Sequence, residues 1–297
     1  MPLELLERIM SPEEKDTLID FASIEKNLDH VHQRNRGIEA IPIAKIVGSI
    51  GRYQDFTEGF LPNRSRISDK YESVRQALMA GHTLPPIKVY QILDNYFVID
   101  GHHRVTIAKN ELKAVYIDAE VTEIHFDFEL SATKSYSYDT EQARTFLIHL
   151  EEDAFKNKTF LNNAILRYPL TVTELTAFGK IFEEIADFHH NYNNGELVKE
   201  HIVFASLLWY EKRFMPAVTI IIAEDILGTF PNRTYTDLYI WIQQHKYYLS
   251  QHAGYDVGFD YTVDDFMQRF SKATFFDVIP QIMQAIVRHI KREIRKI

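Results

Sequence analysis

The residues best suited to chemistry form one run, Asp100-Gly101-His102-His103-Arg104, which lies between two apolar segments. Gly101 would let the backbone approach a ligand closely. A helix that begins at the histidines would present unpaired N–H groups and the positive end of its dipole, which attract phosphate, and Arg104 would add a charge-assisted contact. His102 and His103 can donate hydrogen bonds or move protons near neutral pH. Asp100 can bind Mg²⁺, orient a histidine or act as a base, so the run predicts a phosphate site.

A second stretch, 48–59, carries further candidates. Its two glycines at 48 and 51 predict a flexible loop. Ser49 and Arg52 in this loop are candidates for a second phosphate contact, with a purely structural loop as the alternative. Asp55 and Glu58 follow directly in the same stretch.

Other polar groups are weaker candidates. Arg64, Arg66 and Lys70 are typical of a solvated face and less so of a ligand clamp. His30 and His32, or Glu183, Asp187 and His190 on one predicted helical face, have metal-ligand residue types but no evident further ligands.

The elements around the run predict a compact α+β unit. Strands are expected over 37–48, 87–92, 96–99 and 114–124, with helices over 68–80 and 103–110. Asp94-Asn95 is a turn signal between two strands and predicts a hairpin. Ser11, Pro12 and Glu14 predict a capped helix over 10–30, followed by a polar loop to residue 37.

The pattern changes to helices after residue 130. Helices are expected from Thr171 to about 191, over 196–214 and 216–227, from the capping residues at 234–237 to about 252, and over 280–297. The predicted domains are therefore an N-terminal helix and loop (1–35), an α+β domain (36–130) and a helical domain (131–297).

Composition limits the class of protein. The 297 residues include no cysteine, which excludes disulfides, thiolate metal sites and cysteine nucleophiles. No apolar run approaches the roughly 20 residues that span a bilayer, and the acidic start is unlike a signal peptide, so we expect no membrane partner and a cytoplasmic location. The net charge of −9 disfavours a general nucleic-acid surface, although residues 31–113 carry more Lys and Arg than Asp and Glu.

The segment from Pro85-Pro86 through the hairpin to the Asp100–Arg104 run resembles the ParB/sulfiredoxin superfamily, over roughly residues 36–125. The resemblance implies a ParB/sulfiredoxin-like N-terminal domain, here followed by a mainly α-helical C-terminal domain. It also implies that Gly101, His102, His103 and Arg104 hold nucleotide phosphates at a helix start. The later segments 166–171 and 230–239 resemble a helical extension of some uncharacterised ParB-like bacterial proteins.

Departures from the family narrow the expected activity. Sulfiredoxin chemistry needs a cysteine in this run, and the chain has none. Partition proteins that switch on CTP carry a glutamate where His102 stands. The superfamily's serine kinases have an acidic base after the first strand, a stretch in which Asp55 and Glu58 lie here.

The expected function is that of a nucleotide-binding protein that hydrolyses ATP, ADP or CTP or transfers a phosphoryl group to a small molecule. Asp100 would hold Mg²⁺, and Asp100, His102, His103, Asp55 and Glu58 are the catalytic candidates. The alternatives are a DNA-associated regulator, with DNA binding that weakens steeply with salt, and a ParB-like nuclease. The helical domain is a candidate for homodimer formation.

Overall fold

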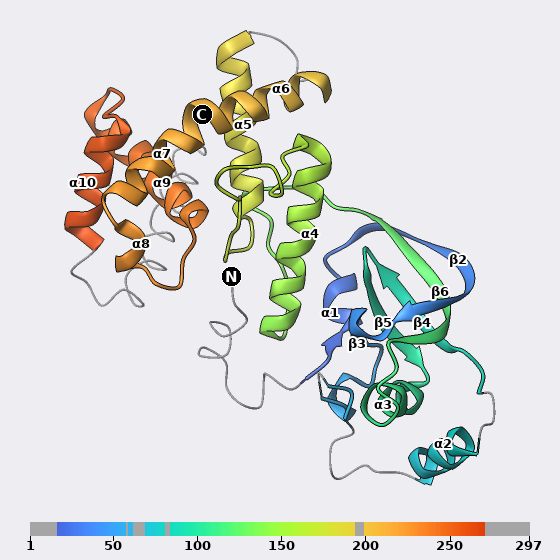
Figure 1. Cartoon of the computed structure of the whole chain (residues 1–297). Helices are drawn as coiled ribbons and strands as arrows, with labels where there is room; N and C mark the ends of the chain where they lie inside the picture. The colour runs from blue at the N-terminus through green and yellow to red at the C-terminus, as the bar shows by residue number, and fades with distance from the viewer. Residues whose placement is uncertain (1–16, 58, 62–68, 81–83, 194–198, 271–297) are drawn as a thin grey trace. The chain divides into compact units, whose positions relative to one another are not determined.

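The structure, a computed structural model, describes residues 17–270 except 58, 62–68, 81–83 and 194–198. The described chain is α+β, with one mixed six-stranded sheet and many helices (Figure 1), as the sequence predicts at this level. It divides into two compact units. Within the described residues, the sheet unit comprises residues 17–129 and 135–150, and the helical unit comprises residues 130–134 and 151–270.

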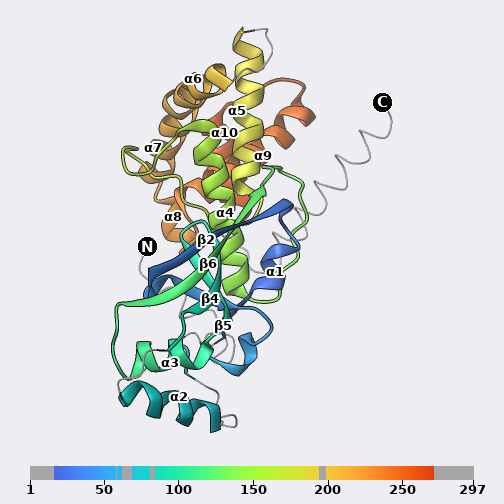
Figure 2. The same ribbon diagram turned by 90° about the vertical axis from the view of Figure 1, so that its right-hand side faces the viewer.

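The sheet has the strand order β1-β3-β5-β4-β6-β2 (Figures 1 and 2). Antiparallel pairs join β4 to β5 and β2 to β6, and the other three neighbouring pairs are parallel. The predicted hairpin is confirmed, because β4 and β5 pair across the turn at 93–94. The strands are β1 (Ile19–Asp20), β2 (Asp29–Pro42), β3 (Ile46–Ser49), β4 (Ile87–Ile92), β5 (Asn95–Asp100) and β6 (Tyr116–Asp127).

Side chains of β5 alternate between the two faces of the sheet, as strand geometry requires. Phe97 contacts Phe21 of α1 (Phe21–Glu25) and Phe146 of α4 (Glu141–Thr159), with ring centroids 5.4 and 5.5 Å away. Val98 packs instead in a core cluster with Phe56 and with Val105 of α3 (His102–Asn110). The helix α2 (Asp69–Met79) lies beside α3 in both ribbon views (Figures 1 and 2).

The helix and loop predicted for the N-terminal region are wrong for the residues that the structure describes there. Residues 17–30 contain β1, the short helix α1 and the start of β2, not a long helix, and the predicted loop 29–37 is strand. β2 is an edge strand that pairs with β6 alone, and most of its side chains face solvent. Over residues 29–36 the strand has no apolar alternation, because none of those side chains is buried. Ser11, Pro12 and Glu14 lie outside the described residues.

The helical unit agrees with the sequence most closely at α9, which begins after Thr234 in a capping box with Asp237 and ends at Gly254. By contrast, α5 begins at Ala177 and not at Thr171, and α4 and α10 were not predicted. The expected helix over 280–297 lies outside the described residues. The helices that follow α4 are α5 (Ala177–Asn193), α6 (Lys199–Trp209), the π-helix η5 (Tyr210–Phe214), α7 (Met215–Ala223), α8 (Ile226–Thr229), α9 (Tyr235–Ala253) and α10 (Phe259–Phe270).

Among the described residues, no helix is both long enough and apolar enough to cross a membrane.

Candidate functional site

Gly101 makes the junction between β5 and α3 in a left-handed conformation, with φ 99° and ψ 21°. A Cβ atom at this position would lie 2.5 Å from Cγ2 of Ile87, closer than any real contact. Glycine is therefore required by both the backbone angle and the space. Because Gly101 has no side chain, it cannot cap the N–H groups of the first turn of α3, the groups that favour an anion.

His102 is anchored from two sides at the start of α3. Its Nε2 lies 2.7 Å from Oγ of Ser49 at the end of β3, and both side chains are buried. Its ring stacks on Phe56, with centroids 5.3 Å apart and planes at 19°. Burial, followed by the positive charge of Arg52, lowers the pKa of His102 to about 4. The imidazole is therefore neutral at neutral pH.

The ring of Phe56 gathers the predicted residues of the 49–55 segment around α3. It meets His103 edge-on at a centroid distance of 5.5 Å, and the Arg52 guanidinium lies 5.3 Å from its centroid on the ring face. Nε of Arg52 donates to Oδ2 of Asp55 at 3.0 Å. Sequence reasoning missed Phe56, although it is an aromatic residue in a largely polar stretch.

Arg104 does not point its charge into open solvent. Its Nη2 pairs with Oδ2 of Asp100 at 2.7 Å, and its Nη1 donates to the carbonyl oxygens of Pro86, at 2.8 Å, and of Pro85. The Arg104 side chain is 14% exposed, whereas the Asp100 side chain is 68% exposed. Arg104 thus fixes the position of an accessible carboxylate and of the chain that enters β4.

The structure brings together most of the predicted site residues of the sheet unit. Ser49, Arg52, Asp55 and residues 100–104 meet at one end of β3 and β5. Glu58, Arg64 and Arg66 lie outside the described residues, as does the side chain of Lys70.

The predicted metal-ligand groups do not assemble within the described part of the chain. His30 pairs with Asp127 at 3.0 Å on the exposed β2–β6 ribbon. No group of three or more His, Asp or Glu side chains there is arranged to hold a metal ion. The side chain of His190 lies outside the described residues, so its predicted grouping with Glu183 and Asp187 stays a prediction. Asp100 by itself fits Mg²⁺ only in the manner of sites that take their other ligands from water and substrate phosphates.

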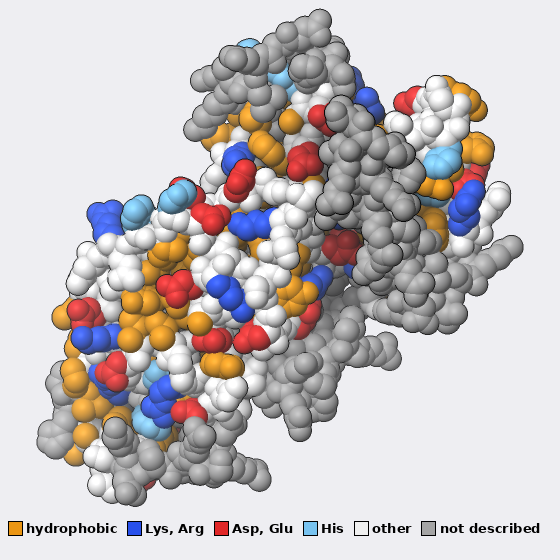
Figure 3. Space-filling model, turned by 180° about the vertical axis from the view of Figure 1, so that it is seen from behind, with side chains coloured by type: hydrophobic (Ala, Val, Ile, Leu, Met, Phe, Trp, Pro, Cys, Tyr) orange, Lys and Arg blue, Asp and Glu red, His pale blue; other side chains and the backbone are white. Residues whose placement is uncertain are grey.

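Charge is mixed on the face of the protein that Figure 3 shows. Lys and Arg side chains alternate with Asp and Glu side chains over the described surface in that view. This arrangement gives no support there to the continuous basic surface expected of a DNA-binding protein.

Comparisons with known proteins give little information about function. Residues 169–270, in the helical unit, match a family described as "Domain of unknown function (DUF4032)". No curated protein matches the chain. Among solved structures, sulfiredoxin from Arabidopsis thaliana is similar over 28% of this chain and 82% of its own, at 19% identity and a TM-score of 0.22. A likeness at this TM-score carries no argument about activity.

Proposed function

We propose that the sheet unit binds the phosphates of a nucleotide at the first turn of α3, and that it hydrolyses the nucleotide or transfers a phosphoryl group to a small molecule. The observation that carries the proposal is the hydrogen bond between Ser49 and His102. It joins two segments, 48–52 and 100–104, each of which has residues suited to phosphate. Their proximity is what a two-sided phosphate site requires.

The residues of the candidate site would contribute to phosphate binding in different ways. Ser49 and His102 are buried and bonded to each other, so they support the site and do not line it. The amides of the first turn of α3 would hold phosphate oxygens. Arg52 would supply the positive charge, because its side chain is 44% exposed whereas that of Arg104 is 14% exposed.

Asp100 is the residue proposed to hold Mg²⁺ together with the nucleotide phosphates. Its carboxylate is exposed, and Arg104 fixes its direction. The proposed base is Asp55, whose side chain is 15% exposed and bonded to Arg52, with Glu58 as the other acidic candidate in the same segment. The ParB/sulfiredoxin resemblance of the 85–109 segment supports a nucleotide as the phosphate carrier.

The test is calorimetry of the full chain with ATP, ADP and CTP in the presence of Mg²⁺. We expect at least one nucleotide to bind and Arg52→Gln to weaken its binding about tenfold, the loss typical of a charge-assisted hydrogen bond. Arg34→Gln is the matched control, because Arg34 is an exposed arginine on β2, at the far edge of the sheet. The proposal fails if no nucleotide binds or if the two variants bind equally.

A second measurement separates an enzyme from a binding protein. Release of inorganic phosphate from the bound nucleotide, or its transfer to an added small molecule, should be lost in Asp100→Asn. Binding without either reaction would overturn the enzymatic half of the proposal. DNA binding that weakens steeply with salt, without nucleotide binding, would favour a DNA-associated regulator instead.

A further inference from the structure

The helical unit contains a cavity of about 800 Å³, within the size range of small-molecule sites. Its walls come mainly from α5 and α9, with the π-helix η5 and residues 254–256 at its margin. Nearly all of its lining residues fall within the segment 169–270, and none belongs to the sheet unit. This cavity is therefore independent of the site proposed at α3.

A hydrogen-bonded carboxyl group lies in the wall of the cavity. The hydroxyl of the fully buried Tyr239 donates to Oε1 of Glu184 at 2.5 Å, and Nε2 of Gln243 donates to the same hydroxyl at 3.1 Å. Burial raises the pKa of Glu184, while the bond from Tyr239 and the charges of Arg213 and Lys246 oppose that rise. The Glu184 carboxyl group is thus held in one orientation, but its surroundings compensate a negative charge on it only in part.

Several charged residues of both signs that line this cavity form no ion pair among the described residues. Within the described residues, Lys180 and Arg213 form no ion pair with any carboxylate, and Glu184 and Asp187 form none with any cation. The neighbouring charges are different, because Lys246 pairs with Asp256 at 2.8 Å. Unpaired charges in a partly enclosed space interact with a ligand more strongly than charges on an open surface.

Two further features indicate a binding site. Arg213 projects from the π-helix η5, a rare backbone form that is found frequently at functional sites. Its guanidinium lies over the ring of Phe188, 5.5 Å from the centroid. Oε1 of Gln244 in the cavity wall is buried without a hydrogen-bond partner among the described residues, an arrangement that native proteins usually avoid.

We propose that this cavity binds a small zwitterion, such as a free α-amino acid or a dipeptide. The ammonium group would lie at Glu184 and Asp187, and the carboxylate would lie at Arg213 and Lys180. A ligand with both charges compensates all four side chains, whereas a simple anion or a simple amine leaves one pair uncompensated. The exposed rings of Tyr247 and Tyr255 line the same cavity and would cover the apolar part of the ligand.

The test is thermal unfolding of the full chain followed by tryptophan fluorescence, because the two tryptophans, Trp209 and Trp241, both lie in the helical unit. The probes are the common α-amino acids and a set of dipeptides, each compared with its decarboxylated amine and its deaminated acid. A ligand that binds the folded unit raises the midpoint. We expect a zwitterion to raise it and both of its singly charged analogues to fail. The set that raises the unfolding midpoint shows whether the ligand is an amino acid or a dipeptide.

Variants then place the ligand in the cavity by calorimetry. Arg213→Gln and Asp187→Asn should each weaken binding about tenfold. Their matched controls, Lys212→Gln and Asp264→Asn, are exposed residues that do not line the cavity, and they should bind like the wild type. If Arg213→Gln fails to fold, Lys180→Gln replaces it. The proposal is overturned if no zwitterion binds, if a singly charged analogue binds as tightly, or if the cavity variants match their controls.

Discussion

Oγ of Ser49 and Nε2 of His102 lie 2.7 Å apart, and both side chains are buried. The bond connects the carboxyl end of β3 to the first turn of α3, across 53 positions of the chain. Because a neutral imidazole has one donor and one acceptor nitrogen, either the ring or the Ser49 hydroxyl can donate in this bond. The bond holds the first turn of α3 against the end of β3, and burial keeps the ring of His102 uncharged at neutral pH.

The stability of the sheet unit should fall as the pH falls from 6.5 to about 4. In the unfolded chain His102 takes up a proton near the ordinary histidine pKa of 6.5, whereas in the folded chain burial lowers the pKa to about 4. Above pH 6.5 His102 is neutral in both the folded and the unfolded chain, so its protonation does not lower the stability there. As the pH falls from 6.5 to about 4, only the unfolded chain takes up the proton, and the free energy of unfolding falls by about 3 kcal/mol.

Urea unfolding followed by far-UV circular dichroism over this pH range measures that change. His102→Gln is the matched variant, because glutamine keeps a side-chain hydrogen-bonding group but has no proton to gain. Carboxylates titrate in the same range in both proteins, so the difference between the two curves isolates the histidine. Curves that run parallel from pH 6.5 to 4 would show that His102 does not carry the effect.

Gly101→Ala should destabilise the sheet unit more than Gly51→Ala. Both glycines have positive φ, at 99° and 70°, so each alanine has a conformational cost of about 1 to 2 kcal/mol. At Gly101 the new methyl group also meets Ile87 at 2.5 Å, whereas at Gly51 it meets nothing within 4 Å. The pair therefore separates backbone strain from steric overlap.

Urea denaturation of the two glycine variants gives the comparison directly. We expect Gly101→Ala to lose at least about 1 kcal/mol more than Gly51→Ala, and to lose nucleotide binding as well if the first turn of α3 shifts. Equal losses would mean that Ile87 moves aside freely and that the junction does not depend on close packing.

The sequence predicted the elements around Gly101 well because their signals are local. The turn signal at 94–95, the glycine at 101 and the apolar periods of β4, β5 and α3 each lie within a few residues. The first part of β2, over 29–36, was missed because it depends on pairing with β6, about 90 residues away, and not on its own pattern. The end of β2 lies within the strand predicted over 37–48, which the structure divides between β2 and β3.

The structure brings the candidate residues of segments 49–55 and 100–104 together, but their individual contacts were not predicted. Asp100 and Arg104 were assigned to Mg²⁺ and to phosphate, and residue type gave no indication that they pair with each other. The carbonyls of Pro85 and Pro86, which hold the same guanidinium, are backbone groups with no signature in the sequence. Phe56 was missed since an aromatic residue is more often simple core, and its contact with both histidines exists only in three dimensions.

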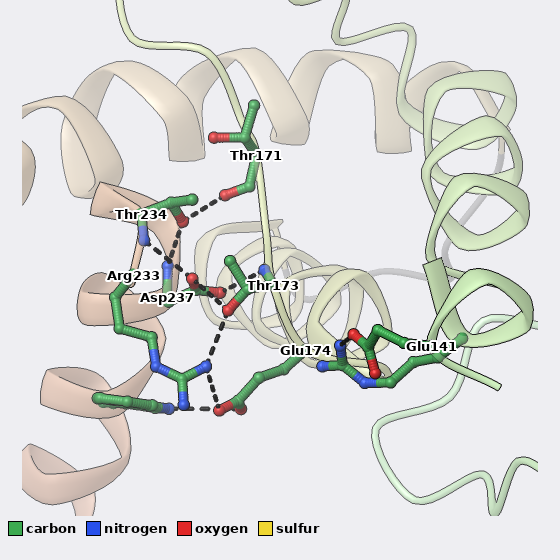
Figure 4. Close-up of polar contacts among 9 residues, drawn as sticks. Glu141, Thr171, Thr173, Glu174, Arg233, Thr234 and Asp237 are labelled. Carbon is green, nitrogen blue, oxygen red and sulfur yellow. Dashed lines mark hydrogen bonds and ion pairs between the residues drawn. The ribbon is translucent and has the colours of Figure 1, made fainter. Parts of the chain in front are cut away.

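Asp237→Ala should destabilise the helical unit by about 3 kcal/mol. The buried carboxylate of Asp237 accepts from the backbone N–H and Oγ1 of Thr173 and from the backbone N–H of Thr234, each at 2.9 Å (Figure 4). It thus completes the capping box of α9 and also holds the segment before α5. Removing it leaves three donors without their partner, and hydrogen bonds to a charged group contribute more than neutral ones.

Tryptophan fluorescence during urea unfolding follows this unit specifically, because Trp209 and Trp241 both belong to it. The control is Asp260→Ala, an exposed aspartate in the first turn of α10, which should cost no more than about 1 kcal/mol through the helix dipole. A loss at Asp237 no larger than that at Asp260 would mean that water replaces the carboxylate at Thr173 and Thr234. The start of α9 would then be held mainly by its apolar contacts, among them the buried ring of Tyr239.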